Sequence, residues 1–214
     1  YGNEVLGTEG TLGVITKIKV RLAEAITERS MDMFIFQNID EVANKLSLLK
    51  LDRNILTIDF LSASSALILG LKPCHRIIVE YSSFDGLIKD QNEIERVTTL
   101  RKTVFKKLAE KGFWYREDVS FSQENFVELI QWLEKNGIPS FGPVGVQFLF
   151  PCFDKREGLT EFYNFLKSIN GAVGGVFGYG TLKKEFVPQE MRHKLINLKE
   201  KFDPYSIMNR GKVI

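Results

Sequence analysis

The sequence contains little cysteine and little histidine. Of its 214 residues, two are cysteine and two are histidine. Cys74 and Cys152 lie far apart and match no metal-binding or redox spacing, so we expect two free thiols in a reducing compartment, which favours the cytoplasm. His75 and His193 have no partner at a spacing typical of a site, so a surface or capping role is favoured over a catalytic one. These residues indicate no metal site.

The sequence also lacks a long apolar run and a strong excess of charge of one sign. No apolar run approaches the roughly 20 residues that span a bilayer, and no charged-then-apolar leader is present. The formal net charge is +2 and the sequence pI is near 8.4, with basic and acidic residues interspersed. We therefore expect no membrane span and no nucleic-acid partner. The abrupt start at Tyr1–Asn3 indicates a piece of a longer protein.

Three evenly spaced glycines occur in residues 7–16, with the sequence G-T-E-G-T-L-G-V-I-T. Gly7, Gly10 and Gly13 recur every three residues, a spacing that favours positive φ and lets a ligand approach the main chain. No Gly-Lys-Ser/Thr follows, so the segment is not a phosphate loop of the Walker kind. A plain β-turn and a ligand cradle both remain open. The next residues, 14–22, place apolar side chains at even positions and predict a strand that needs a partner.

From residue 31 onward, strand and helix patterns alternate. The longest periodic segment, 86–111, predicts an amphipathic helix that packs on a sheet. The short connections and the lack of G-x-G-x-x-G after a first strand argue against a dinucleotide-binding Rossmann domain. We predict an α+β fold, a largely antiparallel sheet with helices packed on one face. The expected strands are 31–36, 55–61, 75–81, 114–121, 141–153 and 172–180, and the expected helices are 38–49, 62–71, 86–111, 122–137, 155–169 and 189–202.

Two rare strings resemble one family of flavoproteins. Residues 7–16 resemble the segment G-S-E-G-T-L-G-I-I-T that closes the FAD-binding domain of enzymes of the vanillyl-alcohol oxidase/PCMH type, in the branch that contains glycolate oxidase and D-lactate dehydrogenase. Residues 202–212, F-D-P-Y-S-I-M-N-R-G-K, resemble the terminal F-D-P-x-x-I-x-N-P-G-K of that branch, with Arg210 in place of proline. The region between resembles the family's C-terminal cap domain.

The resemblance implies a domain organisation and a cofactor. Residues 1–22 would be the C-terminal remnant of an FAD-binding domain, and 23–214 the FAD-linked oxidase cap domain. FAD would be the cofactor of the full-length protein and would not be retained by this piece. The residues implied to contact FAD are Glu9, Gly10, Gly13, Ile15 and Asn209.

In this family the cap supplies histidines and acids from two strings, G-H-x-G-D-G-N-L-H and G-E-H-G-x-G, suited to metal binding or proton transfer. The first aligns with residues 142–150 and the second with 175–180. The matched positions of those ligands are apolar or proline, whereas backbone-shaping glycines remain. The replacements indicate an apolar substrate, a different proton acceptor, or a subunit without oxidase chemistry. They are Pro143, Val146, Phe150, Val176 and Phe177.

The resemblance implies the cap portion of an FAD-dependent oxidoreductase acting on a 2-hydroxy acid or related alcohol. The alternative is a non-catalytic or assembly subunit that keeps the cap fold for partner contact. Tyr179 is a candidate for a substrate-facing hydroxyl, although a core aromatic is the simpler interpretation. Lys183 matches a family lysine, and Arg116 is interpreted as a solvated strand-end charge. The expected partners are a small substrate, the protein's own FAD-binding domain, and a second copy paired through residues 14–22.

Overall fold

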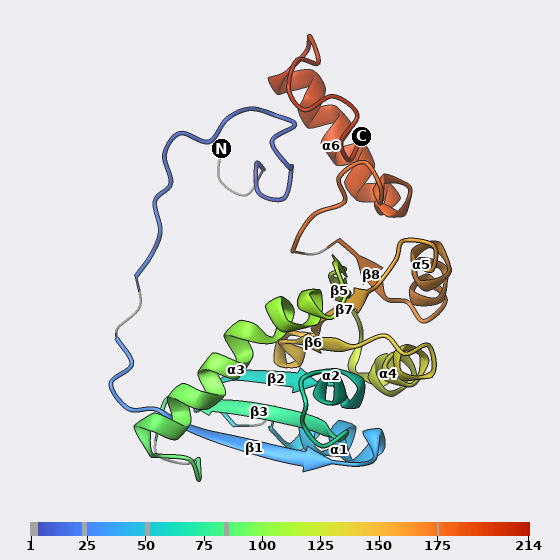
Figure 1. Ribbon diagram of the computed structural model, residues 1–214. Helices are drawn as coiled ribbons and strands as arrows, with labels where there is room; N and C mark the ends of the chain where they lie inside the picture. Colours follow the sequence, from blue (N-terminus) through green and yellow to red (C-terminus); the bar gives the residue numbers. More distant parts are fainter. Residues whose placement is uncertain (1–3, 23–24, 50–51, 84–85, 175) are drawn as a thin grey trace. The chain divides into compact units, whose positions relative to one another are not determined.

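A computed structural model describes residues 4–22, 25–49, 52–83, 86–174 and 176–214 (Figure 1). The chain divides into two compact units, residues 25–171 and residues 1–24 together with 172–214. Three parts of the sequence predictions lie outside the described residues, namely the start at Tyr1–Asn3, residues 23–24 of the expected domain boundary, and Gly175. The assignment of residues 1–22 to an FAD-binding domain stays a prediction.

The unit of residues 25–171 is built on an antiparallel sheet, which confirms the predicted α+β class. Its strand order is β1-β3-β2-β6-β7-β5, and β4 also pairs with β7. Figure 1 shows β1, β3 and β2 side by side. The strands are β1 (Ser30–Phe36), β2 (Ile55–Leu61), β3 (His75–Tyr81), β4 (Tyr115–Arg116), β5 (Val119–Ser120), β6 (Ser140–Gly142) and β7 (Phe148–Phe153).

The helices of this unit begin and end where local residues stabilise the ends. Ser62 caps α2 by accepting from Ser65 N, and Asp90 caps α3 by accepting from Glu93 N. Left-handed conformations follow α4 at Gly137 and α5 at Asn170, which is how helices commonly end. The helices are α1 (Ile39–Leu49), α2 (Ala63–Ile68), α3 (Gln91–Glu110), α4 (Phe126–Lys135) and α5 (Leu159–Ser168), with short 3-10 turns η1 (Gln123–Asn125) and η2 (Val144–Val146).

Helices pack against both faces of the sheet, and in this respect the structure differs from the predicted one-sided arrangement. Asp59 and Phe60 are neighbours on β2, so their side chains point to opposite faces. Asp59 pairs with Arg101 of α3 at 2.5 Å, whereas the Phe60 ring packs edge-to-face on Phe126 of α4. The prediction of helices on one face did not foresee that α3 would pack against the face that carries the Asp59 carboxylate. That carboxylate can be buried there because the guanidinium of Arg101 compensates its charge.

Residues 14–22, predicted as a strand that needs a partner, pair with no strand in the described part of the chain. They adopt no regular secondary structure, and they form no ladder with another described residue. Apolar side chains of this segment are exposed, including Val14 at 77% and Leu22 at 86%. A strand is stabilised by hydrogen bonds to a neighbour, so an apolar alternation without a neighbour remains an open chain.

The second unit contains β8 (Ala172–Val173), η3 (Lys184–Phe186) and α6 (Gln189–Phe202). The strand predicted for 172–180 is therefore only two residues long, and the described residues 176–180 contain no strand. The strand predicted for 141–153 is also interrupted, because η2 separates β6 from β7 and Gln147 has a positive φ of 61°. None of the helices in the described part of the chain has the length and apolar character needed to span a bilayer.

Candidate functional site

The first element of the site is the glycine turn, residues 7–13. Thr11 N and Thr11 Oγ1 both donate to Thr8 O, at 3.0 and 2.6 Å. Gly7 and Gly10 have φ of 75° and 69°, and Glu9 also adopts a positive φ of 51°. Both threonines are buried. The glycine spacing therefore produces a tight turn that its own threonines hold in place.

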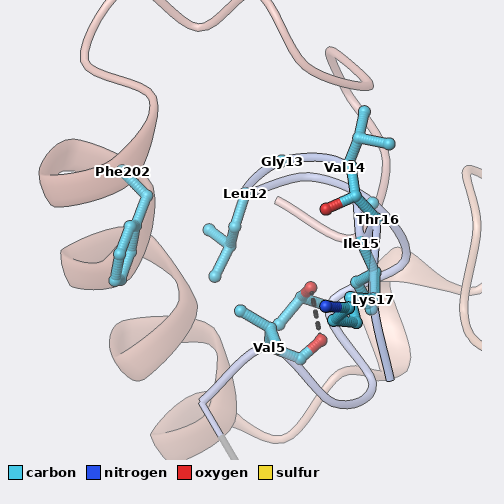
Figure 2. A pocket seen from close by; sticks show the side chains of 10 residues that line it. Val5, Leu12, Gly13, Val14, Ile15, Thr16, Lys17 and Phe202 are labelled. Carbon is cyan, nitrogen blue, oxygen red and sulfur yellow. Dashed lines mark hydrogen bonds between the residues drawn. The ribbon is translucent and has the colours of Figure 1, made fainter. Parts of the chain in front are cut away.

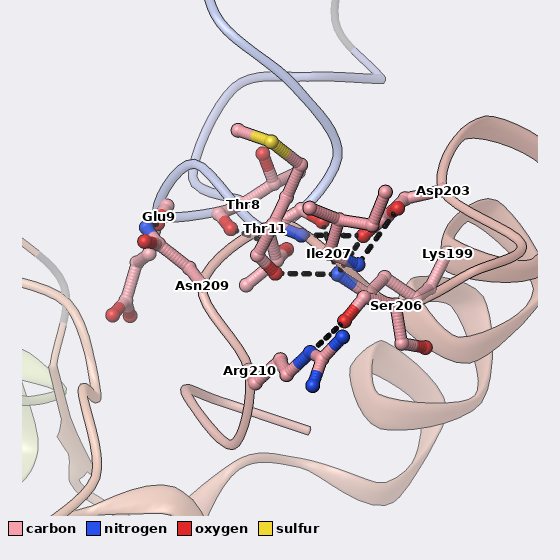
Figure 3. Close-up of polar contacts among 10 residues, drawn as sticks. Thr8, Glu9, Thr11, Lys199, Asp203, Ser206, Ile207, Asn209 and Arg210 are labelled. Atoms are coloured by element: carbon pink, nitrogen blue, oxygen red, sulfur yellow. Dashed lines mark hydrogen bonds and ion pairs between the residues drawn. The ribbon is translucent and has the colours of Figure 1, made fainter.

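A lysine from α6 fastens this turn to the C-terminal tail (Figure 3). Lys199 Nζ donates to Thr11 O, Asp203 Oδ2 and Met208 O, each at 2.6 Å. The Asp203 carboxylate also accepts from Ile207 N at 3.0 Å and from Met208 N at 2.8 Å. All three protons of the ammonium group are thus used. We call Lys199, Asp203 and Thr11 the lysine clasp.

The lysine clasp predicts a specific acid sensitivity. The hydrogen bond from Lys199, followed by that from Ile207 N, lowers the pKa of Asp203 from its ordinary value of 3.8 to about 2. A depressed carboxylate pKa contributes stability above the unfolded value, and that stability is lost as pH falls from about 4 through about 2. We expect the NMR signal of the Asp203 carboxyl carbon to titrate near pH 2. In Lys199→Met the midpoint should rise toward the ordinary value, and a wild-type midpoint near 4 would contradict the clasp.

The two strings from opposite ends of the sequence meet at Asn209. Its side-chain Nδ2 donates to Glu9 O at 2.7 Å. A Cβ added to Gly10 would lie 2.9 Å from the same nitrogen, so only glycine leaves room for this contact. The structure thus brings together Glu9, Gly10 and Asn209, which the resemblance implied as neighbours of a flavin.

The Glu9 side chain makes a second connection within this unit. Its carboxylate accepts hydrogen bonds from Tyr179 N and, at 2.9 Å, from Gly180 N. A Cβ on Gly178 would lie 2.4 Å from Glu9 Oε1. Gly178 therefore leaves the space in which the carboxylate reaches the backbone amides.

A cavity of about 550 Å³ opens beside the glycine turn (Figure 2). Leu12 of the turn and Phe202 of α6 both face it, as Figure 2 shows. Of the five implied cofactor residues, Gly10, Gly13 and Ile15 line this cavity, whereas Glu9 and Asn209 contribute to the turn behind it. The complete lining is Val5, Thr8, Gly10, Leu12, Gly13, Val14, Ile15, Thr16, Lys17 and Phe202.

Tyr179 lies inside its unit. Its side chain is 8% exposed, and its ring is close to the backbone, because a Cβ on Gly174 would lie 3.0 Å from it. These contacts support the interpretation of a core aromatic over that of a substrate-facing hydroxyl. Lys183 is buried as well.

The apolar replacements in the two family strings lie in different units. Pro143 and Val146, of the first string, line a cavity of about 320 Å³ beside β2. Phe150 packs edge-to-face on Phe105 of α3. Val176 and Phe177, of the second string, are 56% and 47% exposed. A pocket shared by the two strings stays a prediction.

The histidines and cysteines occupy structural positions. His75 is buried rather than at the surface, and its Nδ1 accepts from Ala63 N at 3.1 Å, which is a capping role. Burial lowers the pKa of His75, while Glu134 opposes that shift. His193 is exposed on α6. Cys74 and Cys152 are free cysteines, in agreement with the prediction of two free thiols, and both are buried.

Arg116 belongs to the unit of residues 25–171 and not to the unit that carries the glycine turn. Arg116 is exposed at the end of β4 and its guanidinium lies over the Phe105 ring. Among the residues that the structure describes, no three His, Cys, Asp or Glu side chains are grouped so that they could hold a metal ion. Sequence reasoning missed Lys199 and Asp203 as a unit. The available signal was their i, i+4 spacing, with Lys199 just before the terminal string and Asp203 inside it.

Comparisons with known proteins agree with the sequence resemblance. The chain is 22% identical over 261 aligned positions to glycolate oxidase subunit GlcD of Bacillus subtilis (strain 168). The alignment covers 97% of this chain and 56% of that protein. The resemblance to FAD-linked oxidases is thereby confirmed. The chain spans little more than half of the length of its relative.

Two other comparisons add little. A solved structure, chitooligosaccharide oxidase, is similar with a TM-score of 0.42 and 9% identity, covering 83% of this chain and 53% of that one. No protein-family profile matches the chain. The α+β fold is therefore established by its own strands and helices.

Proposed function

We propose that this chain is the cap portion of an FAD-dependent oxidoreductase that acts on a 2-hydroxy acid or a related alcohol. The observation that carries the proposal is the meeting of the two family strings, where Asn209 Nδ2 donates to Glu9 O beside Gly10. Glu9 and Asn209 are 200 positions apart in the sequence and are joined by this hydrogen bond. Each lies in a string that the resemblance implies to contact a flavin. The similarity to a glycolate oxidase subunit over 97% of the chain supports it.

The residues of the cavity fit part of the proposed cofactor. Gly13 has no heavy atom within 4 Å of an added Cβ, so its main chain is open to a planar group. Leu12 and Ile15 provide apolar walls, which suit the ring system of a flavin. When bound, FAD would supply a hydride acceptor. Gly10, Gly13 and Ile15 would hold and orient it, and Asn209 would fix the turn that carries them.

The buried clasp gives this arrangement its rigidity. Lys199 and Asp203 are only 13% and 7% exposed at their side chains, and they join the turn to the tail that carries Asn209. A turn held this way loses little conformational freedom when a ligand binds. The chain's own contribution to the proposed reaction is therefore to position one side of the cofactor.

We expect the purified 214-residue chain to hold little or no FAD. Only Gly10, Gly13 and Ile15 are proposed to contact the cofactor, on a turn that Glu9 and Asn209 hold in place, and the adenine and pyrophosphate would need groups from an FAD-binding domain. The measurement is the flavin absorbance band of the purified chain, together with a titration of added FAD. A yellow preparation with near-stoichiometric FAD would show that the chain alone forms the site.

The proposed partner of residues 14–22 is another strand, from the FAD-binding domain or from a second copy of the chain. Val14, Ile18 and Val20 are 77%, 73% and 69% exposed, and an exposed apolar alternation promotes association. We expect the purified chain to sediment as a dimer, and Ile18→Lys to shift it to monomer. A wild-type monomer with rapid amide exchange in residues 14–20 would refute the association.

An assembly subunit is the second candidate function. The replacements at Pro143, Val146, Phe150, Val176 and Phe177 favour it, because they remove the groups that the family uses for metal binding and proton transfer. The glycine turn and Asn209 favour the enzyme, since both strings are kept. Flavin reduction by a substrate in the longer protein distinguishes the two.

A further inference from the structure

The loop of residues 178–180 holds a carboxylate with its backbone. Tyr179 N and Gly180 N donate to the two oxygens of the Glu9 side chain, one N–H to each oxygen. Gly178 and Gly180 have positive φ values of 78° and 57°. Successive amides in such conformations point the same way and form a concave site for an anion.

The space for the carboxylate depends on glycine. A Cβ on Gly178 would lie 2.4 Å from Glu9 Oε1 and 2.6 Å from its carboxyl carbon. A larger residue would thus fill the position that the carboxylate occupies. The loop is shaped for this group both by its donors and by the missing side chain.

We infer that residues 178–180 form a carboxylate-binding site and that Glu9 is its internal ligand. A small external carboxylate competes with Glu9 for the two amides. Because Glu9 lies in the glycine turn, an external carboxylate that displaces it releases the turn from the 178–180 loop. Binding of an external carboxylate at residues 178–180 is thus coupled to release of the glycine turn. This coupling does not depend on flavin binding.

The tether explains why the internal ligand predominates. A group attached by a short linker has an effective concentration on the order of millimolar or higher. External acetate must exceed that concentration to displace Glu9 from the wild-type chain. Removing the side chain by Glu9→Ala abolishes the competition, so acetate should bind to the variant at a concentration at least about tenfold lower.

The test follows the amide signals of Tyr179 and Gly180 by NMR while sodium acetate is added at constant ionic strength. In Glu9→Ala we expect saturable shifts at both amides, together with slower hydrogen exchange of these N–H groups. The wild-type chain and Glu4→Ala, which removes an exposed acid from the same segment, should respond only at much higher acetate.

Two further outcomes decide the inference. The double variant Glu9→Ala/Gly178→Ala should lose the acetate response, because the new methyl group occupies the carboxylate position. If Glu9→Ala loosens the unit, acetate should restore the hydrogen-exchange protection of Tyr179 and Gly180. Absence of both shift and protection in Glu9→Ala, or equal responses in all four proteins, would overturn the assignment.

Discussion

Chelating divalent metals should leave the rate of flavin reduction unchanged in the proposed full-length, FAD-dependent protein. The positions matched to the family's histidines and acids are apolar or proline in this sequence. Five side chains that would hold a metal or take a proton have thus been replaced. They are Pro143, Val146, Phe150, Val176 and Phe177.

The same replacements predict poor turnover of small polar 2-hydroxy acids. A general base contributes about 10²- to 10⁴-fold in rate, and a Lewis-acid metal stabilises the developing charge by several kcal/mol. Glycolate and D-lactate should therefore reduce the flavin slowly, and 2-hydroxy acids with larger apolar side chains should do so faster. The measurement is anaerobic stopped-flow absorbance, with and without chelator.

A fast reaction with glycolate that the chelator abolishes would refute this prediction. It would mean that the two strings are misaligned and that other residues supply the ligands. His75 and His193 would then be the first residues to substitute, since the sequence has no other histidines. His75→Gln and His193→Gln would each be compared with the wild-type protein for chelator sensitivity.

Replacing Phe60 with alanine should strongly destabilise the unit of residues 25–171. The Phe60 side chain is fully buried. Its ring lies 5.3 Å from the Phe126 ring and 5.6 Å from the His75 ring. Phe→Ala in a well-packed core costs about 3–5 kcal/mol, because the transfer free energy is lost and a cavity remains. Urea unfolding followed by circular dichroism should show this decrease.

Leu87→Ala is the matched control. Its side chain is 87% exposed, and a surface substitution changes the free energy of unfolding by about 0.5 kcal/mol or less. If Phe60→Ala lowers the free energy of unfolding no more than Leu87→Ala does, the Phe60 ring is not part of a close-packed core. Helix packing on that face of β2 would then need another explanation.

Local features of the fold could be predicted from the sequence because they depend on nearby residues. The apolar spacing between Ile94 and Leu108 predicted α3, and Ser62 caps α2 as expected. The two-sided covering of the sheet could not be predicted, because it depends on a pair distant in sequence, Asp59 and Arg101. Burial raises the pKa of Asp59, while Arg101 opposes that shift. A carboxylate in a strand gives no sequence signal for such a partner.

The candidate site likewise has some features that the sequence predicted and others that it did not. The two strings predicted Gly10 and Asn209, which the structure joins through Glu9 O. The lysine clasp was not predicted, since Thr11 O and Met208 O are backbone acceptors and carry no side-chain signature. The strand predicted for residues 14–22 stays a prediction, because its partner would come from outside the described residues. Its alternation is clear, but a strand also requires a neighbour that the sequence pattern does not provide.

The most direct test of the proposed function is flavin reduction by substrate in the longer protein. The protein would be mixed anaerobically with a panel of 2-hydroxy acids and related alcohols while its absorbance is recorded. We predict that it binds FAD near stoichiometrically and that at least one 2-hydroxy acid or alcohol bleaches the flavin band. A protein without FAD, or one whose flavin stays oxidised with every compound, would contradict the enzyme and favour an assembly subunit.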